Sequence, residues 1–210
     1  MRAFLCAVVL VLAGALGFSQ GAAPALSYVD GTVTIDGAAA SVGDAVRYGA
    51  VVRTAAASSA EIEFNGRNAI RLSENTTLVF NPRNLQTGSE LRQGGLAFVL
   101  KGLSTATAGP SFLVRTPSAV AGVRGTSFFM QVESPTSTYV CSCNGAVQVL
   151  DASGRVAKEL AASHHKAVRI SDTGSGPQTT DAPRLYHTDA DLEKVAGDVG
   201  VTIDWNVIDR

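Results

Sequence analysis

Charged residues are scarce in this chain, and the two signs nearly cancel. They make up 17% of the 210 residues, with 17 Lys and Arg against 18 Asp and Glu and a formal net charge of −1. The cations are scattered among the anions, so the sequence lacks the basic patch that binds nucleic acid. Aromatic residues are also few, at 6%. No basic amphipathic helix is evident, which argues against binding to a membrane surface.

The sequence also lacks the common signatures of catalysis. No serine lies in a Gly-x-Ser-x-Gly elbow, and no Cys-His pair comes with a convincing third group to orient it. Glu61 and Glu63 alternate with Ile62 and Phe64, a pattern typical of a solvated strand face. No Cys-x-x-Cys-His run indicates covalent haem. We therefore predict that the protein is not an enzyme.

Residues 1–23 have the order of a secretory signal peptide. Arg2 precedes an apolar run at residues 3–18, and small residues follow it. The run has about 16 residues against the ~20 that cross a bilayer, so we expect cleavage, and no stable membrane insertion afterwards. Cys6 would leave with the signal. The sequence has no Arg-Arg pair, so the chain is expected to cross unfolded and to acquire any cofactor outside. The mature protein is predicted to be periplasmic or extracellular.

Short runs of β-type residues alternate with Gly, Asn and Pro through residues 28–171. No helical period interrupts them, and a chain of many short strands must hide its edges in a roll, solenoid, barrel or sandwich. We predict an all-β domain at residues 24–171. Residues 172–210 are predicted to be a polar linker and a C-terminal tail. In that tail, Thr188 can cap a short helix that ends near residue 196, and residues 199–205 resemble a small docking strand or anchor.

The stretch VRTPSAVAGVRGTSFFMQV at residues 114–132 predicts a strand that ends at Pro117 and a second strand at residues 127–132. Between them, the small residues 119–122 and Gly125 predict a tight corner. With VGDAVRYGAVVRT before it and VCSCNGAVQVL after it, this stretch resembles the FecR domain family over residues 28–171. The resemblance implies an extracytoplasmic β-roll or solenoid. Proteins of this family carry a periplasmic segment that senses an outer-membrane receptor, joined through a membrane helix to a cytoplasmic anti-sigma region. The sequence shows no counterpart of those last two parts, so direct control of a sigma factor cannot be carried over from the family.

Potential metal ligands gather in the last third of the chain: Cys141, Cys143, His164, His165 and His187. The Asn144-Gly145 step predicts a two-residue hairpin turn. The alternation around it places Val140, Val147 and Val149 on the core face and both cysteines on the outer face. The family pattern has no cysteines at these outward positions, so the presence of the two cysteines needs an explanation.

Three explanations of the cysteine pair are open. The thiols could be small hydrophobic groups packed under the C-terminal tail, or they could form a disulfide if the strand deforms. Alternatively, they are soft metal ligands that act with the histidines. His164 and His165 would point to opposite faces of a regular strand, so both reach one ion only if a turn lies at residues 163–166. Otherwise His187 could supply the fourth ligand. Zinc is the metal expected from this ligand set, although the spacing leaves other transition metals open.

The sequence predicts an exported binding or signalling module of the cell envelope, organised by this Cys/His metal site. Its expected partner is an envelope protein or an outer-membrane component. Two other functions stay open at this point. One is a periplasmic metal-handling or redox protein that uses the Cys/His site itself. The other is a structural envelope protein that binds a polymer or a protein partner through its β surface.

Overall fold

The structure is a computed structural model that describes residues 23–82, 86, 88–101, 111–123, 125–151, 153–172 and 176–208. Fifteen strands and one helix lie in these ranges, which confirms the prediction of an all-β fold with a short C-terminal helix. The predicted signal peptide lies, apart from Ala23, outside the described residues. The elements are β1 (Ala25–Asp30), β2 (Val33–Ile35), β3 (Ala38–Ala39), β4 (Val51–Thr54), β5 (Ser59–Phe64), β6 (Asn68–Leu72), β7 (Thr77–Val79), β8 (Ser89–Leu100), β9 (Phe112–Arg115), β10 (Ala119–Val123), β11 (Ser127–Ser134), β12 (Ser137–Asp151), β13 (Val156–Ala162), β14 (Lys166–Asp172), β15 (Pro177–Ala182) and α1 (Asp189–Asp198).

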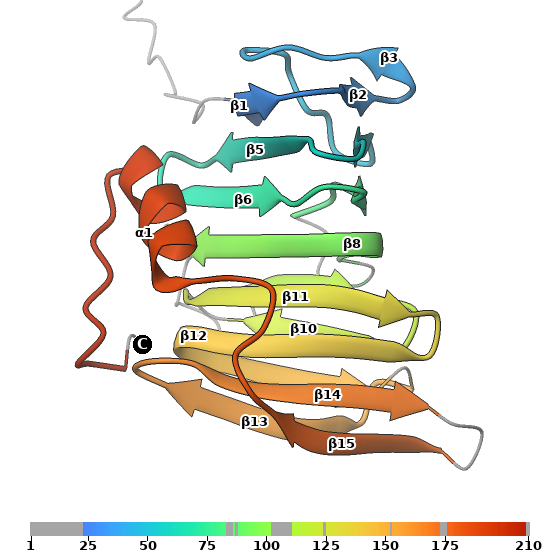
Figure 1. Ribbon diagram of the computed structural model, residues 1–210, viewed down its shortest axis with the longest axis vertical. Helices are drawn as coiled ribbons and strands as arrows, with labels where there is room; N and C mark the ends of the chain where they lie inside the picture. Colours follow the sequence, from blue (N-terminus) through green and yellow to red (C-terminus); the bar gives the residue numbers. More distant parts are fainter. Residues whose placement is uncertain are drawn as a thin grey trace, which may run out of the picture.

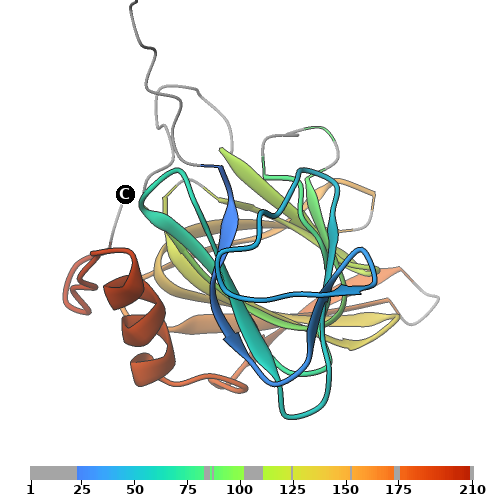
Figure 2. The ribbon, with the colours of Figure 1, turned by 90° about the horizontal axis from the view of Figure 1, so that it is seen from above.

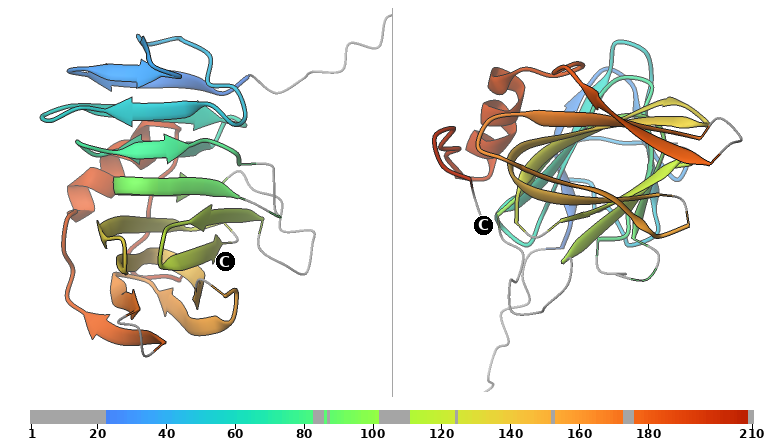
Figure 3. Two further views of the ribbon diagram at one scale, coloured as in Figure 1. Left: turned by 90° about the vertical axis from the view of Figure 1, so that its right-hand side faces the viewer. Right: turned by 90° about the horizontal axis from the view of Figure 1, so that it is seen from below.

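The strands stack along the long axis of the molecule as a roll with two walls (Figure 1 and, from its side and from below, Figure 3). The front wall has the order β1-β5-β6-β8-β11-β12-β14-β15. The rear wall has the order β3-β2-β4-β7-β8-β9-β10-β12-β13, in which only the β8–β9 pair is parallel. Because β8 and β12 belong to both walls, the sheet is continuous and closes around a core, as the view from above shows (Figure 2).

Glycines mark the points where the two long strands pass from one wall to the other. In β8, Gln93 pairs with the rear wall, whereas Gly94 and the residues after it pair with β11. Gly94 has a φ of 81°, and a Cβ there would lie 2.6 Å from the Cα of Thr76. Similarly, Gly145 of β12 has a φ of 125° and begins the part that pairs with β13. A side chain is strained in both conformations, so glycine permits these corners.

The main core fills the space between the walls. Alternate residues of the front wall point into it, and Phe98 of β8 stacks on Phe128 of β11 with ring centroids 4.1 Å apart. Both rings are fully buried. Aromatic side chains bury large apolar areas, so this pair contributes strongly to holding the front wall on the core.

A second apolar cluster lies on the outer face of the front wall, where the C-terminal segment (residues 184–208) covers it. Helix α1 packs on β6 and β8 (Figure 1). The buried residues of the segment are Leu192, Val195, Ala196, Val199, Val201 and Ile203, and they meet Ala69, Ala97, Val99 and Phe129 of the sheet. The outer face is therefore part of the folded interior at this end.

Two expectations about the C-terminal region are wrong in detail. Residues 177–182 were expected within a polar linker, but they form β15, because their backbone pairs with the free edge of β14. Residues 199–205 form no strand, because Val201 donates its backbone N–H to the carbonyl of Ala196 and follows the helix end. They are instead the expected anchor, since Val199, Val201 and Ile203 are buried in the outer cluster. The predicted helix is confirmed, with Thr188 as its N-cap. At ten residues it is the one helix in the described ranges, and none there is long and apolar enough to cross a membrane.

Candidate metal centre

Strand β12 presents both cysteines to the outer face, beneath the C-terminal segment. Tyr139, Cys141 and Cys143 belong to the outer apolar cluster, whereas Val140 points into the main core. The predicted hairpin at Asn144-Gly145 is wrong, because β12 runs without a break from Ser137 to Asp151. The Asn-Gly step is used instead for the corner between the walls.

The face assignment nevertheless holds, because β12 has a bulge at Cys143. Ser127 pairs with Asn144 and Phe128 pairs with Ser142, so Cys143 is an extra residue on its strand. One extra residue reverses the alternation beyond it. Val147 and Val149 therefore point into the main core on the same side as Val140, although their numbers have the opposite parity.

His165 reaches the cysteines from the turn between β13 and β14. Its φ of 46° is left-handed, and its backbone N–H donates to the carbonyl of Cys143 at 3.1 Å. A turn is present at residues 163–166, the condition set for both histidines to reach one ion, but only His165 joins the cysteines and His187. It separates the two adjacent histidines, because the side chain of His165 is 8% exposed and that of His164 is 47% exposed. His164 lies against Trp205 and Asp189, away from the thiols.

His187 reaches the same point from the C-terminal segment. Its ring stacks on Phe129 with centroids 4.5 Å apart, and the residue is 7% exposed. The preceding residue, Tyr186, has a φ of 67°, a strained value for an aromatic residue, and this turn brings His187 back towards the sheet. Three separate parts of the chain thus contribute to one cluster.

The four ligand atoms form a compact group. The Sγ of Cys141 lies 3.6 Å from the Nδ1 of His165, and the Sγ of Cys143 lies 3.3 Å from the Nε2 of His187. The two histidine nitrogens are 3.3 Å apart, and all four atoms lie within 4.8 Å of one another. With ordinary Zn–S and Zn–N bond lengths, the edges of a tetrahedron measure about 3.4 Å between two nitrogens and about 3.6 Å between nitrogen and sulfur. The three distances match such edges closely.

Both imidazoles are oriented by a hydrogen bond on the nitrogen that faces away from the cluster. The Nε2 of His165 lies 2.7 Å from a carboxylate oxygen of Asp189, and the Nδ1 of His187 lies 2.8 Å from the carbonyl oxygen of Leu185. Each acceptor favours a proton on that outer nitrogen and leaves the inner nitrogen free to bind a metal. This is the second shell found around histidine ligands in metalloproteins.

Asp189 was not among the residues selected from the sequence. It also accepts from His164 at 3.0 Å and pairs with Arg184. As the first residue of α1, it lies where an acidic side chain is common for reasons of helix stability alone. Its position after Thr188 therefore gave no signal of a role beside His165.

The electrostatics of the cluster favour a thiolate. Hydrogen bonds from Cys143, His165 and His187 lower the pKa of Cys141 to about 3, against the effect of burial. Burial, together with the neighbouring Cys141 thiolate, raises the pKa of Cys143. Burial opposes protonation of His165, but its hydrogen bonds to Cys141 and Asp189 raise its pKa above the ordinary value. The site thus already favours one thiolate in the absence of any metal charge.

The same side chains also form a line from nucleophile to base to carboxylate: Cys141, His165 and Asp189. Such a line could activate a cysteine for attack on a substrate. Both thiols are fully buried, however, under the C-terminal segment, and the pair shows no disulfide. A reactive cysteine needs access to its substrate. The arrangement is therefore suited to holding an ion rather than to turning over a substrate.

Known proteins resemble this chain mainly within residues 50–148. None of the curated proteins matches the chain. A crystal structure of a candidate anti-sigma factor from Parabacteroides distasonis is similar to it, with 14% sequence identity and a TM-score of 0.45. The similarity covers 62% of this chain, which spans 59% of the length of that protein. The family model described as FecR protein matches residues 50–148. This match spans β4 to β12 and includes both cysteines, but it ends before His165 and His187. Residues 50–148 of this chain are a FecR domain.

Proposed function

We propose that this protein is an exported FecR-domain module for binding or signalling in the cell envelope, and that a structural Zn²⁺ fastens its C-terminal segment to the roll. The ion is bound by Cys141, Cys143, His165 and His187. The geometry of those four side chains is the observation that carries the proposal. The signal-like residues 1–23 support export.

The charge of the site supports zinc in particular. Two thiolates balance the two charges of the ion, so the first shell is neutral and can be buried at little electrostatic cost. Mixed sulfur and imidazole ligands suit Zn²⁺, and four protein ligands leave no position for water or substrate. A closed site of this kind stabilises a fold and performs no chemistry.

The position of the site explains what the ion would stabilise. Cys141 and Cys143 lie in the front wall, His165 lies in the β13–β14 turn, and His187 lies in the C-terminal segment. One ion would cross-link all three. It would therefore order residues 184–208 over the outer face, where α1 packs on β6 and β8.

The partner of the module is proposed to be an envelope protein or an outer-membrane component. The FecR domain supports this proposal, because it makes up most of the roll. A metal-handling protein is the competing proposal. It requires an accessible ion that exchanges, whereas both thiols are buried.

The test is metal analysis of the mature protein purified from the envelope under non-reducing conditions. We expect one zinc per chain that survives dialysis against a weak chelator, and Co²⁺ substitution should give the visible absorption of tetrahedral thiolate coordination. His165→Ala should lose the metal. His164→Ala is the matched control and should keep it, because its side chain lies outside the cluster.

Each alternative has its own result in the same experiment. Two free thiols without metal would favour simple packing, and a Cys141–Cys143 disulfide would favour a redox role. A metal that exchanges readily into the chelator would favour metal handling. Equal metal loss in the two histidine variants would contradict the proposed ligand set.

A further inference from the structure

The outer face of the front wall has two halves of different character. The pairing of β6, β8 and β11 aligns Arg71, Ala97 and Phe129 in one row across the strands. The next row contains Ser73, Gly95 and Gln131: Ser73 donates its backbone N–H to the carbonyl of Gly95, and Gly95 is the register partner of Gln131. The first half is apolar and lies under α1 and the residues that follow it. The second half is polar and α1 does not reach it.

A groove crosses this polar half. Its lining comes from two strands, one turn and the C-terminal segment: Ser73, Glu74, Asn75, Gln93, Gly94, Gln131, Val132, Glu133 and Tyr186. Tyr186 stands at one end, 54% exposed and in a left-handed backbone conformation. Its hydroxyl donates to Glu133 at 2.8 Å, and its ring meets Tyr139 edge-on. These contacts fix the ring at the rim.

The groove offers uncharged hydrogen-bonding groups with spare capacity. Within the described ranges, the side-chain amides of Asn75 and Gln93 have no protein partner, and Gln131 donates only to the neighbouring carbonyl of Val132 at 3.3 Å. An amide both donates and accepts. Glu133 is already paired with Arg169, so Glu74 is the one lining carboxylate without an ion pair in the described structure.

These properties restrict the class of ligand. Among the residues that the structure describes, no Lys or Arg lines the groove, so an anionic polymer would find no counter-charge from them. An apolar ligand would meet little apolar surface beyond Val132 and Tyr186. A peptide cannot add as a strand here, because β8 and β11 are paired on both sides. A neutral chain rich in hydroxyl groups fits best, because each hydroxyl donates and accepts like an amide, and a sugar ring can lie against an aromatic side chain.

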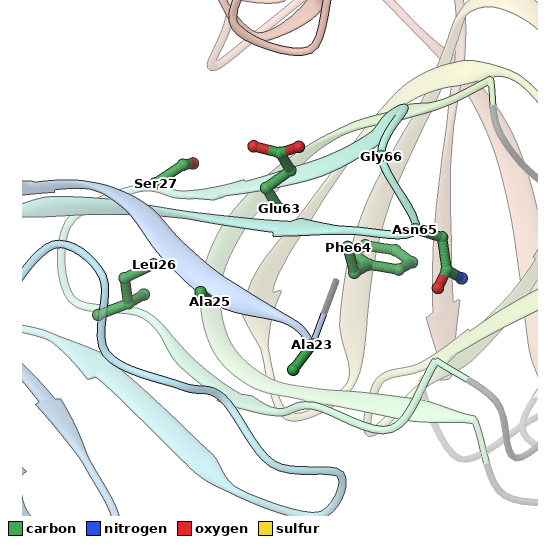
Figure 4. A pocket seen from close by; sticks show the side chains of 8 residues that line it. All are labelled: Ala23, Ala25, Leu26, Ser27, Glu63, Phe64, Asn65 and Gly66. Carbon is green, nitrogen blue, oxygen red and sulfur yellow. The ribbon is translucent and has the colours of Figure 1, made fainter. Parts of the chain in front are cut away.

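We infer that this groove binds an oligosaccharide, with Asn75, Gln93 and Gln131 as its hydrogen-bonding groups and Tyr186 as its aromatic edge. The three amides do not depend on the metal, since none of the four proposed ligands lines the groove, whereas Tyr186 precedes the ligand His187 and rests on the proposed function for its position. Another hollow, lined by Ala23, Leu26, Glu63 and Phe64 (Figure 4), carries no comparable argument because it borders the start of the described chain. A glycan strand of the cell envelope would present the required chemistry to an exported protein.

The test is an NMR titration of the ¹⁵N-labelled mature protein with chitotetraose, a neutral chain of four amino sugars. We expect shifts in the side-chain amides of Asn75, Gln93 and Gln131. Gln93→Ala should weaken binding at least about fivefold, the effect of one lost hydrogen bond. This side chain is exposed and has no protein partner, so the variant should fold normally. Gln148→Ala is the matched control, because Gln148 bonds Glu159 on the rear wall, and binding should be unchanged.

The inference is overturned if these amides do not shift at about 10 mM chitotetraose, ten times a Kd of 1 mM. Shifts confined to other surfaces, or equal effects of the two glutamine variants, would also overturn it. A trilysine peptide tests the competing class: binding of this peptide at Glu74 without binding of the saccharide would assign the groove to a cationic ligand instead. Loss of the metal in His165→Ala with saccharide binding retained would separate this site from the proposed zinc site.

Discussion

Glu133 is the most highly paired carboxylate on the outer face, and its replacement by glutamine gives a pH-dependent prediction. Arg169 donates two hydrogen bonds to it, at 2.6 and 2.7 Å, and Ser137 and Tyr186 each donate one at 2.8 Å. The Arg169 hydrogen bonds, opposed by partial burial and aided by those from Tyr186 and Ser137, lower the pKa of Glu133 to about 2 from its ordinary value of 4.5. The ionised carboxylate therefore stabilises the fold.

The size of the expected loss in unfolding free energy follows from this pKa shift. A pKa change from 4.5 to about 2 corresponds to about 3.4 kcal/mol, at 1.36 kcal/mol for each pKa unit. The side chains of Glu133 and Arg169 are 15% and 35% exposed, so solvent screens part of this interaction. We expect Glu133→Gln to lower the free energy of unfolding by about 1–2 kcal/mol at pH 7.

The sign of the pH dependence is fixed by the direction of the pKa shift. A carboxyl with a depressed pKa stabilises the folded state above its unfolded pKa, and this contribution is lost as the pH falls through the folded pKa. The difference in unfolding free energy between the wild type and Glu133→Gln should therefore be largest above about pH 5 and should decrease between pH 4.5 and about 2. Urea denaturation midpoints across this range measure it. Glu90→Gln is the control, because Glu90 forms an exposed pair with Arg92 and should change stability by less than ~0.5 kcal/mol. A loss that is equal at pH 2 and pH 7 would refute the electrostatic account.

Three further predictions concern the corner, the tail and export. Gly125→Val should cost about 1–3 kcal/mol in a denaturation experiment, because Gly125 has a φ of 64°; an unchanged midpoint would show that this corner tolerates a side chain. Asn144→Ala should loosen residues 204–208, because the buried Asn144 amide donates to the carbonyls of Ser163, Asp204 and Val207. Faster hydrogen exchange in those residues and altered Trp205 fluorescence would show it, whereas unchanged exchange would contradict it. N-terminal mass spectrometry of envelope-extracted protein should find a chain that begins between residues 20 and 24, and an intact Met1 would rule out cleavage.

The fold could be predicted from the sequence where one local feature decides it. The break at Pro117, the left-handed Gly125 and the Thr188 cap each act within a few residues, and each is found in the structure. Residues 119–122 were expected in the corner but belong to β10, which pairs with β9 and β12. The hairpin predicted at Asn144-Gly145 is wrong for a physical reason. The same dipeptide permits either a hairpin or a bend within one strand, and the choice depends on β10, β11, β13 and β14, which pair with the two halves of β12. That competition is not visible in a local pattern.

The prediction of a polar linker at residues 177–182 is wrong for a similar reason. Residues 177–182 are polar and exposed, so their sequence predicts no strand. They form one because β14 leaves an edge free, and the ladder satisfies backbone groups whatever the side chains are. A polar strand at the end of a roll also protects the edge from other chains. Its composition therefore fits its position, although composition alone does not reveal it.

The candidate site shows where sequence reasoning ends and geometry begins. All four ligand side chains could be selected from the sequence because so few Cys and His lie in residues 24–210, but the choice between His164 and His165 could not be made there. The left-handed backbone of His165 decides it: the two rings are neighbours, with centroids 4.8 Å apart, but the cluster of four ligand atoms includes His165 and not His164. Asp189 then binds both rings with different oxygens. A metal at the four-residue cluster would therefore order the helix start through Asp189 as well as through His187, and this double connection explains how one ion could hold the whole C-terminal segment in place.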